Sequence, residues 1–243
     1  MRILAFDTSS SISAVSVVDG DRVLAEDDAP SAALHGETLV PRIRAAMQRA
    51  GLAYTDLDLV AVGVGPGSFT GLRVGLATAK GLALAAGVAL RGVDSLAALA
   101  RGALEDARVG ATENAIAVTV VDAHRGEVFV AAYARSEGDA LRVLLAPACA
   151  APEAAAALVR DACAASVSVG AALVCGDAAV AHGAAFVGAL GGRARMADAQ
   201  GGSPRGRFLA AEARSAFARE GASDLATLEP FYLRQAEVTL PSR

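Results

Sequence analysis

The sequence predicts an α/β protein made of two related subdomains, each with a mixed sheet. The same order of elements, strand–turn–strand–turn–strand–helix–strand, occurs twice along the 243 residues, with Asp7 and Asp122 in equivalent places. An apolar strand at Leu59–Val64 also runs into a glycine-rich turn and then a long Ala/Leu-rich helix, which is typical of an α/β unit. The repeated order indicates an internal duplication.

Hydrophobic pattern and turn residues place the elements of the first half. The unbroken apolar run near the N-terminus predicts a central strand, and Asp19-Gly20 predicts a hairpin turn, because glycine accepts positive φ. The predicted strands are Arg2–Phe6, Ile12–Val18, Arg22–Glu26 and Leu59–Val64, and the predicted helices run from about Gly36 to Ala50 and from the glycine-rich turn to near Gly87.

The second half repeats these signals. Its predicted strands are Ala115–Val121, Glu127–Tyr133, Leu141–Ala146 and Ala172–Cys175, and its helix runs from Pro152 to about Cys163. A last helix near Arg207–Arg219 is expected to return to the first subdomain. The predicted division is therefore 1–107 plus 204–243 for the first subdomain and 108–203 for the second.

Composition narrows the classes of function. With 54% hydrophobic and 20% charged residues the chain can build a core, so disorder is not expected. Aromatic residues make up only 4% and Trp is absent, which argues against an aromatic platform for stacking bases. A net charge of −4 argues against a chain that grips nucleic acid alone. Any RNA is expected to be held chiefly by a partner.

The cysteines and the N-terminal residues indicate the cellular compartment of the protein. Cys149, Cys163 and Cys175 show neither disulfide nor zinc spacing, so reduced thiols are expected. The N-terminus leads directly into a strand, and no long uninterrupted apolar run is present. We therefore expect a cytoplasmic protein with no signal peptide and no membrane contact.

The turn Gly65-Pro66-Gly67-Ser68-Phe69-Thr70-Gly71 has two possible roles. Its backbone N–H groups could cradle an anion at the start of a helix, although no Walker A Lys-Ser/Thr pair follows. The alternative, which we favour, is a tight turn in which Ser68 or Thr70 caps the helix. The candidates for a vestigial phosphate site are Asp7, Thr8, Gly65, Gly67, Ser68 and Asp122. Side chains beside both aspartates indicate a lost nucleotide cleft.

Small residues at Gly71, Gly75 and Ala79 form a ridge along the helix after this turn. The ridge could pack against the chain's own sheet, or it could let the helix of another chain approach closely. The tail Pro230-Phe231-Tyr232-Leu233-Arg234 has a similar ambiguity, since its aromatic residues could tie down the chain or anchor a partner.

Several segments resemble the TsaB/TsaD family of the actin-like ATPase superfamily, whose fold is related to that of ribonuclease H. They are Ile3–Ser9, His35–Pro41, Gly63–Gly81 (GVGPGSFTGLRVGLATAKG), Asp122–Val128 and Pro230–Arg234. Within this family the chain looks like the TsaB (YeaZ) branch. The resemblance implies two actin-like subdomains and a part in placing threonylcarbamoyl on adenosine 37 of tRNA (t6A).

The resemblance also implies a scaffold subunit without catalytic activity of its own. TsaD-like chains carry two metal-binding histidines where this chain has Ser95 and Leu99, and neither residue substitutes for imidazole. The three histidines, His35, His124 and His182, have no metal-ligand spacing. No catalytic, metal or cofactor site is therefore expected here, and ATP and metal are expected on partner subunits.

The implied partners are TsaD, in a heterodimer, the ATPase TsaE, and tRNA indirectly through the complex, with a homodimer when the chain is alone. The expected interface residues are His35, Leu39, Ile43, Met47, Gly71, Leu72, Gly75, Ala79 and Tyr232. Two rivals remain: an independent actin-like ATPase or phosphotransferase, and a self-sufficient homodimeric module with another task.

Overall fold

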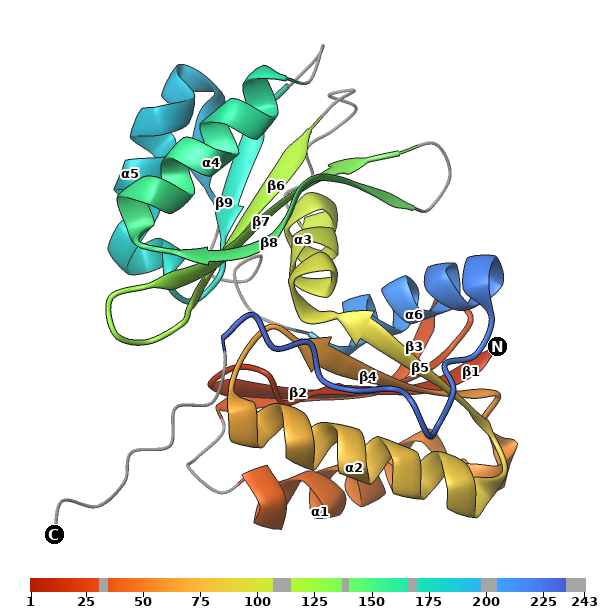
Figure 1. Ribbon diagram of the computed structural model, residues 1–243. Helices are drawn as coiled ribbons and strands as arrows, with labels where there is room; N and C mark the ends of the chain where they lie inside the picture. Colours follow the sequence, from red (N-terminus) through yellow and green to blue (C-terminus); the bar gives the residue numbers. More distant parts are fainter. Residues whose placement is uncertain (31–34, 107–114, 137–139, 166–169, 198–204, 235–243) are drawn as a thin grey trace, which may run out of the picture.

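In the computed structural model the chain forms two lobes, each built on a five-stranded sheet (Figure 1). The structure describes all residues except 31–34, 107–114, 137–139, 166–169, 198–204 and 235–243. Among the described residues, no helix has the length and apolar character needed to cross a bilayer. Both predicted subdomain boundaries, at 107/108 and 203/204, lie outside the described residues.

The first half of the chain supplies the first sheet. Its elements are β1 (Arg2–Asp7), β2 (Ile12–Asp19), β3 (Arg22–Pro30), α1 (His35–Ala50), β4 (Leu59–Gly65), α2 (Phe69–Ala86), β5 (Ala89–Asp94) and α3 (Ser95–Asp106). A short 3-10 turn at Tyr54–Asp56 precedes β4. The strand order is β3-β2-β1-β4-β5, with antiparallel pairing among the first three and parallel pairing after β1.

The second half repeats this plan. Its elements are β6 (Ile116–Asp122), β7 (Val128–Arg135), β8 (Leu141–Ala150), α4 (Pro152–Ala164), β9 (Ala172–Cys175), α5 (Ala179–Leu190), a 3-10 turn (Gly191–Arg193), β10 (Ala194–Met196) and α6 (Gly206–Glu220). The order β8-β7-β6-β9-β10 matches that of the first sheet strand for strand. The predicted mixed sheets and repeated order are thus confirmed.

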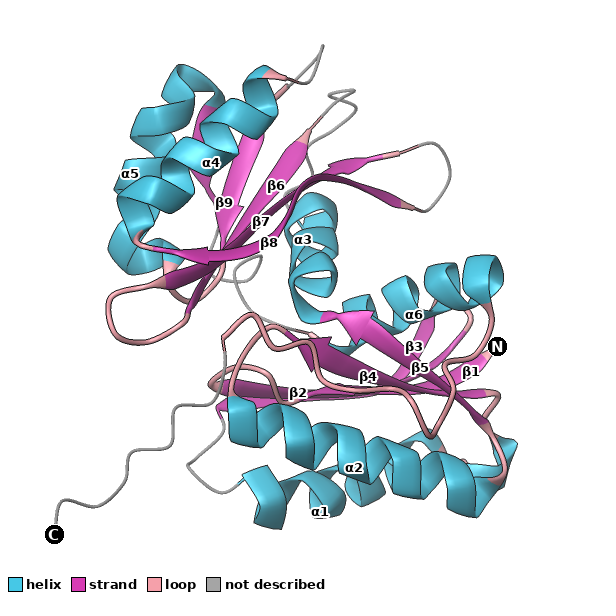
Figure 2. Ribbon diagram, in the orientation of Figure 1, coloured by secondary structure: helices cyan, strands magenta, loops and turns pink. Residues whose placement is uncertain are grey.

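Both faces of the first sheet are covered, which explains why β1 is apolar without interruption. Leu4 and Phe6 cluster with residues of α1 and α2, whereas Ile3 and Ala5 cluster with residues of α6. Figure 2 shows α1 and α2 along one face of this sheet. The predicted return of the last helix to the first sheet is confirmed, because α6 packs on β1, β2 and β5.

Helices α3 and α6 exchange positions between the halves. α3 follows β5 in the chain but packs on β6, β7 and β9 of the second sheet, and it also contacts α6. We therefore define the first lobe as β1–β5 with α1, α2 and α6, and the second lobe as β6–β10 with α3, α4 and α5.

The predicted strands and helices are all present, and four elements lay outside the prediction: β5, α3, α5 and β10. Two predicted strands were too short. β3 continues to Pro30 and β8 to Ala150, past Pro147. Both strands lie at a sheet edge, where a residue without an N–H donor is tolerated.

Candidate functional site

Residues that follow β1 and residues that end β6 line one cleft between the lobes, with a volume of about 870 Å³. The first lobe contributes Ser68 and the turn 9–11, and the second contributes Asp122, the turn 124–127 and His182. Two of the predicted phosphate candidates, Ser68 and Asp122, thus lie on this cleft. The other four lie elsewhere: Asp7 and Thr8 belong to the turn after β1, and Gly65 and Gly67 belong to the glycine-rich turn that packs on it.

The turn after β1 is closed. Asp7 is buried, and its Oδ1 accepts a hydrogen bond from the backbone N–H of Ser9 at 2.7 Å. Thr8 is fully buried and donates its hydroxyl hydrogen bond to the carbonyl of Gly71 at 2.7 Å. Because both side chains are engaged inside the protein, neither faces the cleft.

The glycine-rich turn lies directly on these residues. Ser68 donates its N–H to the carbonyl of Ser9 at 2.7 Å, and its Oγ accepts from the N–H of Gly71 at 3.2 Å, which caps α2. A methyl group on Gly67 would overlap the Ser9 carbonyl, and one on Gly71 would overlap the Thr8 carbonyl. These glycines permit close packing of two backbone segments. The geometry favours the structural alternative for this turn.

The equivalent turn after β6 is open. His124, Arg125 and Gly126 have φ values of 61°, 57° and 79°, and all three are exposed. Asp122 accepts a hydrogen bond from the His124 N–H at 2.7 Å, and its Oδ2 lies 3.1 Å from His124 Nδ1. This exposed pair is screened by solvent and contributes little to stability. Polar groups are therefore accessible at this turn of the second lobe, whereas the equivalent polar groups of the first lobe are buried.

The two residues at the expected position of metal-binding histidines have structural contacts. The Ser95 hydroxyl accepts a hydrogen bond from the N–H of Gly65 at 3.2 Å, and Leu99 packs in the core between α3 and the second sheet. Among the described residues, no group of three or more His, Cys, Asp and Glu side chains is placed to hold a metal ion. His35 is the first residue of α1, and its side chain is outside the described part of the chain.

The predicted interface residues require a correction. Seven of them are core residues of the first lobe, because the helical stripe that looked available faces the chain's own sheet. They are Leu39, Ile43, Met47, Gly71, Leu72, Gly75 and Ala79. A side chain at Gly75 would collide with Thr8, so the small-residue ridge packs inside the molecule.

A different ridge of α2 faces outward. Arg73, Ala77, Gly81 and Leu84 are exposed, and Leu84 is 74% exposed. Val40 on the adjacent α1 is 53% exposed. Figure 1 shows α1 and α2 side by side on the outer face of the first lobe.

The tail joins the two lobes. Phe231 donates its N–H to the carbonyl of Val64 at 2.7 Å, and the Tyr232 hydroxyl accepts from Arg73 Nε at 3.0 Å. Two residues later, Arg234 donates to the carbonyl of Ala123 at 2.9 Å in the second lobe. The segment Phe231–Arg234 thus connects the two lobes, and it also lines a smaller cleft of about 340 Å³.

A buried hydrogen bond links the lobes near the start of α3. Asp94 accepts from the Leu96 N–H at 2.8 Å and from the Tyr133 hydroxyl at 2.6 Å. Burial raises the pKa of Asp94, and the Tyr133 hydrogen bond opposes that rise. Burial also raises the pKa of Tyr133, which keeps its hydroxyl protonated as the donor. No local pattern in the sequence predicts this contact, since the two residues belong to different repeats.

The fold is that of a two-lobed actin-like protein. It has two sheets with the same strand order, two helices exchanged between the halves, and a cleft at the ends of β1 and β6. Comparison with known proteins supports this class. The ROK hexokinase of Thermus thermophilus shares the fold at a TM-score of 0.50 with 15% identity, covering 87% of this chain and 97% of that one.

More similar proteins narrow the family. The family model described as TsaD, tRNA N6-adenosine threonylcarbamoyltransferase, matches residues 29–175, more than half of the chain. The tRNA threonylcarbamoyladenosine biosynthesis protein TsaB of Escherichia coli (strain K12) is 36% identical over 137 residues, 56% of this chain and 57% of that protein. The match thus spans little more than half the length of this curated relative.

A solved structure extends the likeness over nearly the whole chain. YeaZ from Pseudomonas aeruginosa superimposes with a TM-score of 0.76 and 26% identity, covering 96% of this chain and 99% of that one. The chain belongs to the TsaD family, and within that family it is of the TsaB (YeaZ) type.

Proposed function

We propose that this chain is a non-catalytic subunit of the machinery that places threonylcarbamoyl on adenosine 37 of tRNA. The names of its relatives refer to this modification. The observation that carries the proposal is the engagement of Ser95 and Leu99 in structural contacts, at the place where TsaD-like chains bind the catalytic metal. A partner of the TsaD kind would hold ATP and metal and perform the transfer.

In this proposal the outer face of α1 and α2 binds TsaD, or a second copy of this chain when TsaD is absent. The support is the exposure of Val40 on α1 and of Ala77, Gly81 and Leu84 on α2, because exposed apolar and small side chains allow another helix pair to approach. Recruitment of the ATPase TsaE and indirect contact with tRNA complete the proposed assembly. An independent ATPase has less support, because the turn after β1 is filled by side chains and by the glycine-rich turn.

The test is size-exclusion chromatography of the chain mixed with TsaD, together with a transfer assay on unmodified tRNA. We expect a heterodimer, and transfer only when both chains and TsaE are present. Ala77→Arg should abolish the heterodimer without unfolding the chain, because the position is exposed. The matched control is Ala184→Arg, at an exposed position of α5, the equivalent helix of the second lobe.

Three results would contradict the proposal. Transfer by the chain without TsaD would show that it is catalytic. A homodimer that persists in the presence of TsaD, with no heterodimer, would favour the self-sufficient module. Tight magnesium-dependent ATP binding by the chain alone would support the ATPase alternative.

A further inference from the structure

The smaller cleft gathers a large share of the chain's few aromatic residues. The chain has seven Phe and three Tyr, and four of these line the cleft: Phe69, Phe129, Phe231 and Tyr232. They come from the start of α2, from β7 and from the tail. Low aromatic content argued against a stacking surface, but the fold concentrates these side chains in one place.

Two of the rings are exposed and held in position. Phe231 is 42% and Tyr232 is 38% exposed. The hydrogen bond from the Phe231 N–H to the Val64 carbonyl holds the backbone from which the first ring projects. The Tyr232 ring centroid lies 5.1 Å from the Phe69 ring centroid, and the Tyr232 hydroxyl accepts a hydrogen bond from Arg73. Rings fixed before binding lose little conformational freedom when a planar ligand stacks on them.

Cationic groups accompany these rings. The Arg73 guanidinium lies 3.8 Å from the Phe69 ring centroid, and Arg125 and Arg234 line the cleft itself. Asp122 also lines the cleft and accepts a hydrogen bond from the His124 N–H, and Glu127 lies 3.5 Å from Arg234. The cleft therefore combines aromatic surfaces with guanidinium groups, although the whole chain is acidic.

The size of the cleft limits what it can hold. About 340 Å³ lies near the lower end of small-ligand sites, enough for one nucleotide and too little for a helix of a partner protein. Aromatic faces with guanidinium groups are the side chains that recognise unpaired bases in RNA loops.

We propose that this cleft binds one unstacked nucleotide of an RNA loop, with the base on the Phe231–Tyr232 surface and a phosphate beside Arg125. This inference rests on the proposed function, because it assigns part of the tRNA contact to this chain. It also gives the open turn after β6 a role in binding.

The test is the affinity of the purified full chain for a fluorescent RNA hairpin with a single-stranded loop, measured by anisotropy. Phe231→Leu keeps the backbone and apolar volume but removes the aromatic face, and should weaken binding about tenfold. Arg125→Gln should weaken binding and lower the slope of log affinity against log salt by about one phosphate contact.

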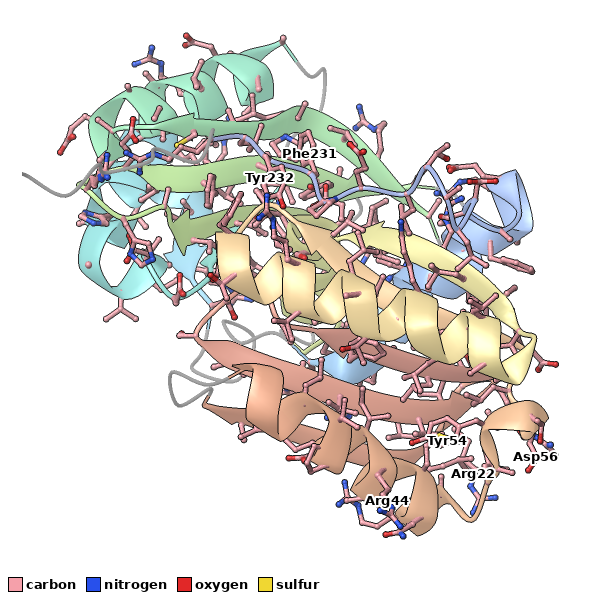
Figure 3. The ribbon with its side chains drawn as sticks, turned by 60° about the horizontal axis from the view of Figure 1, so that its bottom comes forward. Arg22, Arg44, Tyr54, Asp56, Phe231 and Tyr232 are labelled. Atoms are coloured by element: carbon pink, nitrogen blue, oxygen red, sulfur yellow. The ribbon has the colours of Figure 1, made fainter. Side chains whose placement is uncertain are left out.

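Matched controls lie at the far end of the first lobe. Figure 3 shows Tyr54 and Arg44 together there, away from Phe231 and Tyr232. Tyr54→Leu and Arg44→Gln make the same chemical changes and should leave hairpin affinity unchanged. Thermal unfolding of each variant checks that the fold is kept.

Two results would overturn the inference: no hairpin binding by the wild-type chain, or equal affinity for wild type and both cleft variants. A Phe231→Leu chain that binds RNA normally but loses TsaD would identify a protein contact instead. Transfer that proceeds without this chain, together with intact hairpin binding, would contradict the proposed function and leave this inference standing.

Discussion

The two lobes have the same strand order but treat the first turn of their sheets differently. In the first lobe the turn at Asp7–Ser9 is buried under the glycine-rich turn and the start of α2. In the second lobe the turn at 124–126 is exposed in left-handed conformation and lines both clefts. The difference teaches that one copy of a duplicated fold can convert a ligand-facing turn into packing while the other keeps it accessible.

The largest effect is expected where the lobes are joined. Arg101 of α3 lies 2.5 Å from Glu212 of α6, and both are buried. Arg101→Met should destabilise the chain by about 3–5 kcal/mol, because it leaves a buried carboxylate without this cation. Urea unfolding measures the change. The double variant Arg101→Met/Glu212→Leu should recover most of the loss, and failure to recover would contradict the explanation.

The next test compares the two turns directly. Gly71→Ala should cost about 1–3 kcal/mol, since the new methyl meets the Thr8 carbonyl. Gly126→Ala, in the open turn, meets no atom and should cost only the backbone strain of roughly 1–2 kcal/mol. Gly81→Ala, exposed on α2, is the control and should stabilise the helix by about 0.5–1 kcal/mol. Equal losses at positions 71 and 81 would refute the packing difference.

A smaller effect concerns pH and the contact between β3 and α6. Burial, reinforced by Glu26, raises the pKa of Asp28 to about 6, although its carboxylate accepts from the Gly206 N–H at 3.3 Å. The folded chain therefore holds a proton that the unfolded chain releases between about pH 4 and 6, so this group's contribution to stability falls as pH rises through that window. Asp28→Asn keeps the acceptor and should remove the dependence.

The check is the difference in unfolding free energy between wild type and Asp28→Asn at pH 4 and pH 7. We expect the wild type to lose stability relative to the variant as the pH rises. A constant difference would mean that the carboxylate titrates at its ordinary value in the folded chain.

The smallest effect is on thiol reactivity, which probes the second lobe alone. Burial raises the pKa of Cys175 to about 12, and Cys163 is also buried, whereas Cys149 is partly exposed. A thiol reagent should modify Cys149 first in the native chain, and all three only after unfolding. Mass spectrometry of partly labelled protein identifies the site. Early labelling of Cys175 would show that the second lobe opens more readily than its packing implies.

Local sequence signals predicted the repeated part of the fold well. The strands β1, β4, β6 and β9 are short apolar runs bounded by turn residues. The helices α1 and α4 begin or end at residues that favour helix termini. The elements that escaped prediction are weakly patterned. β5 contains Gly92, which packs against Leu228 and Val64, and α5 is apolar over most of its surface, so neither shows a clear period.

The site was harder to predict because helical periodicity identifies a buried stripe without saying what buries it. Gly71, Gly75 and Ala79 were assigned to a partner, but Thr8 and Val62 of the same chain occupy that space. The cleft at the tail was missed for another reason. Its aromatic residues are far apart in the sequence, and only the return of the tail across both lobes brings Tyr232 to Phe69.

The exchange of α3 and α6 makes each sheet depend on a helix from the opposite half of the polypeptide. Neither half, expressed by itself, could cover both faces of its sheet, because one covering helix would be missing and an apolar face would remain in water. Separately produced halves should therefore fold only as a complementing pair.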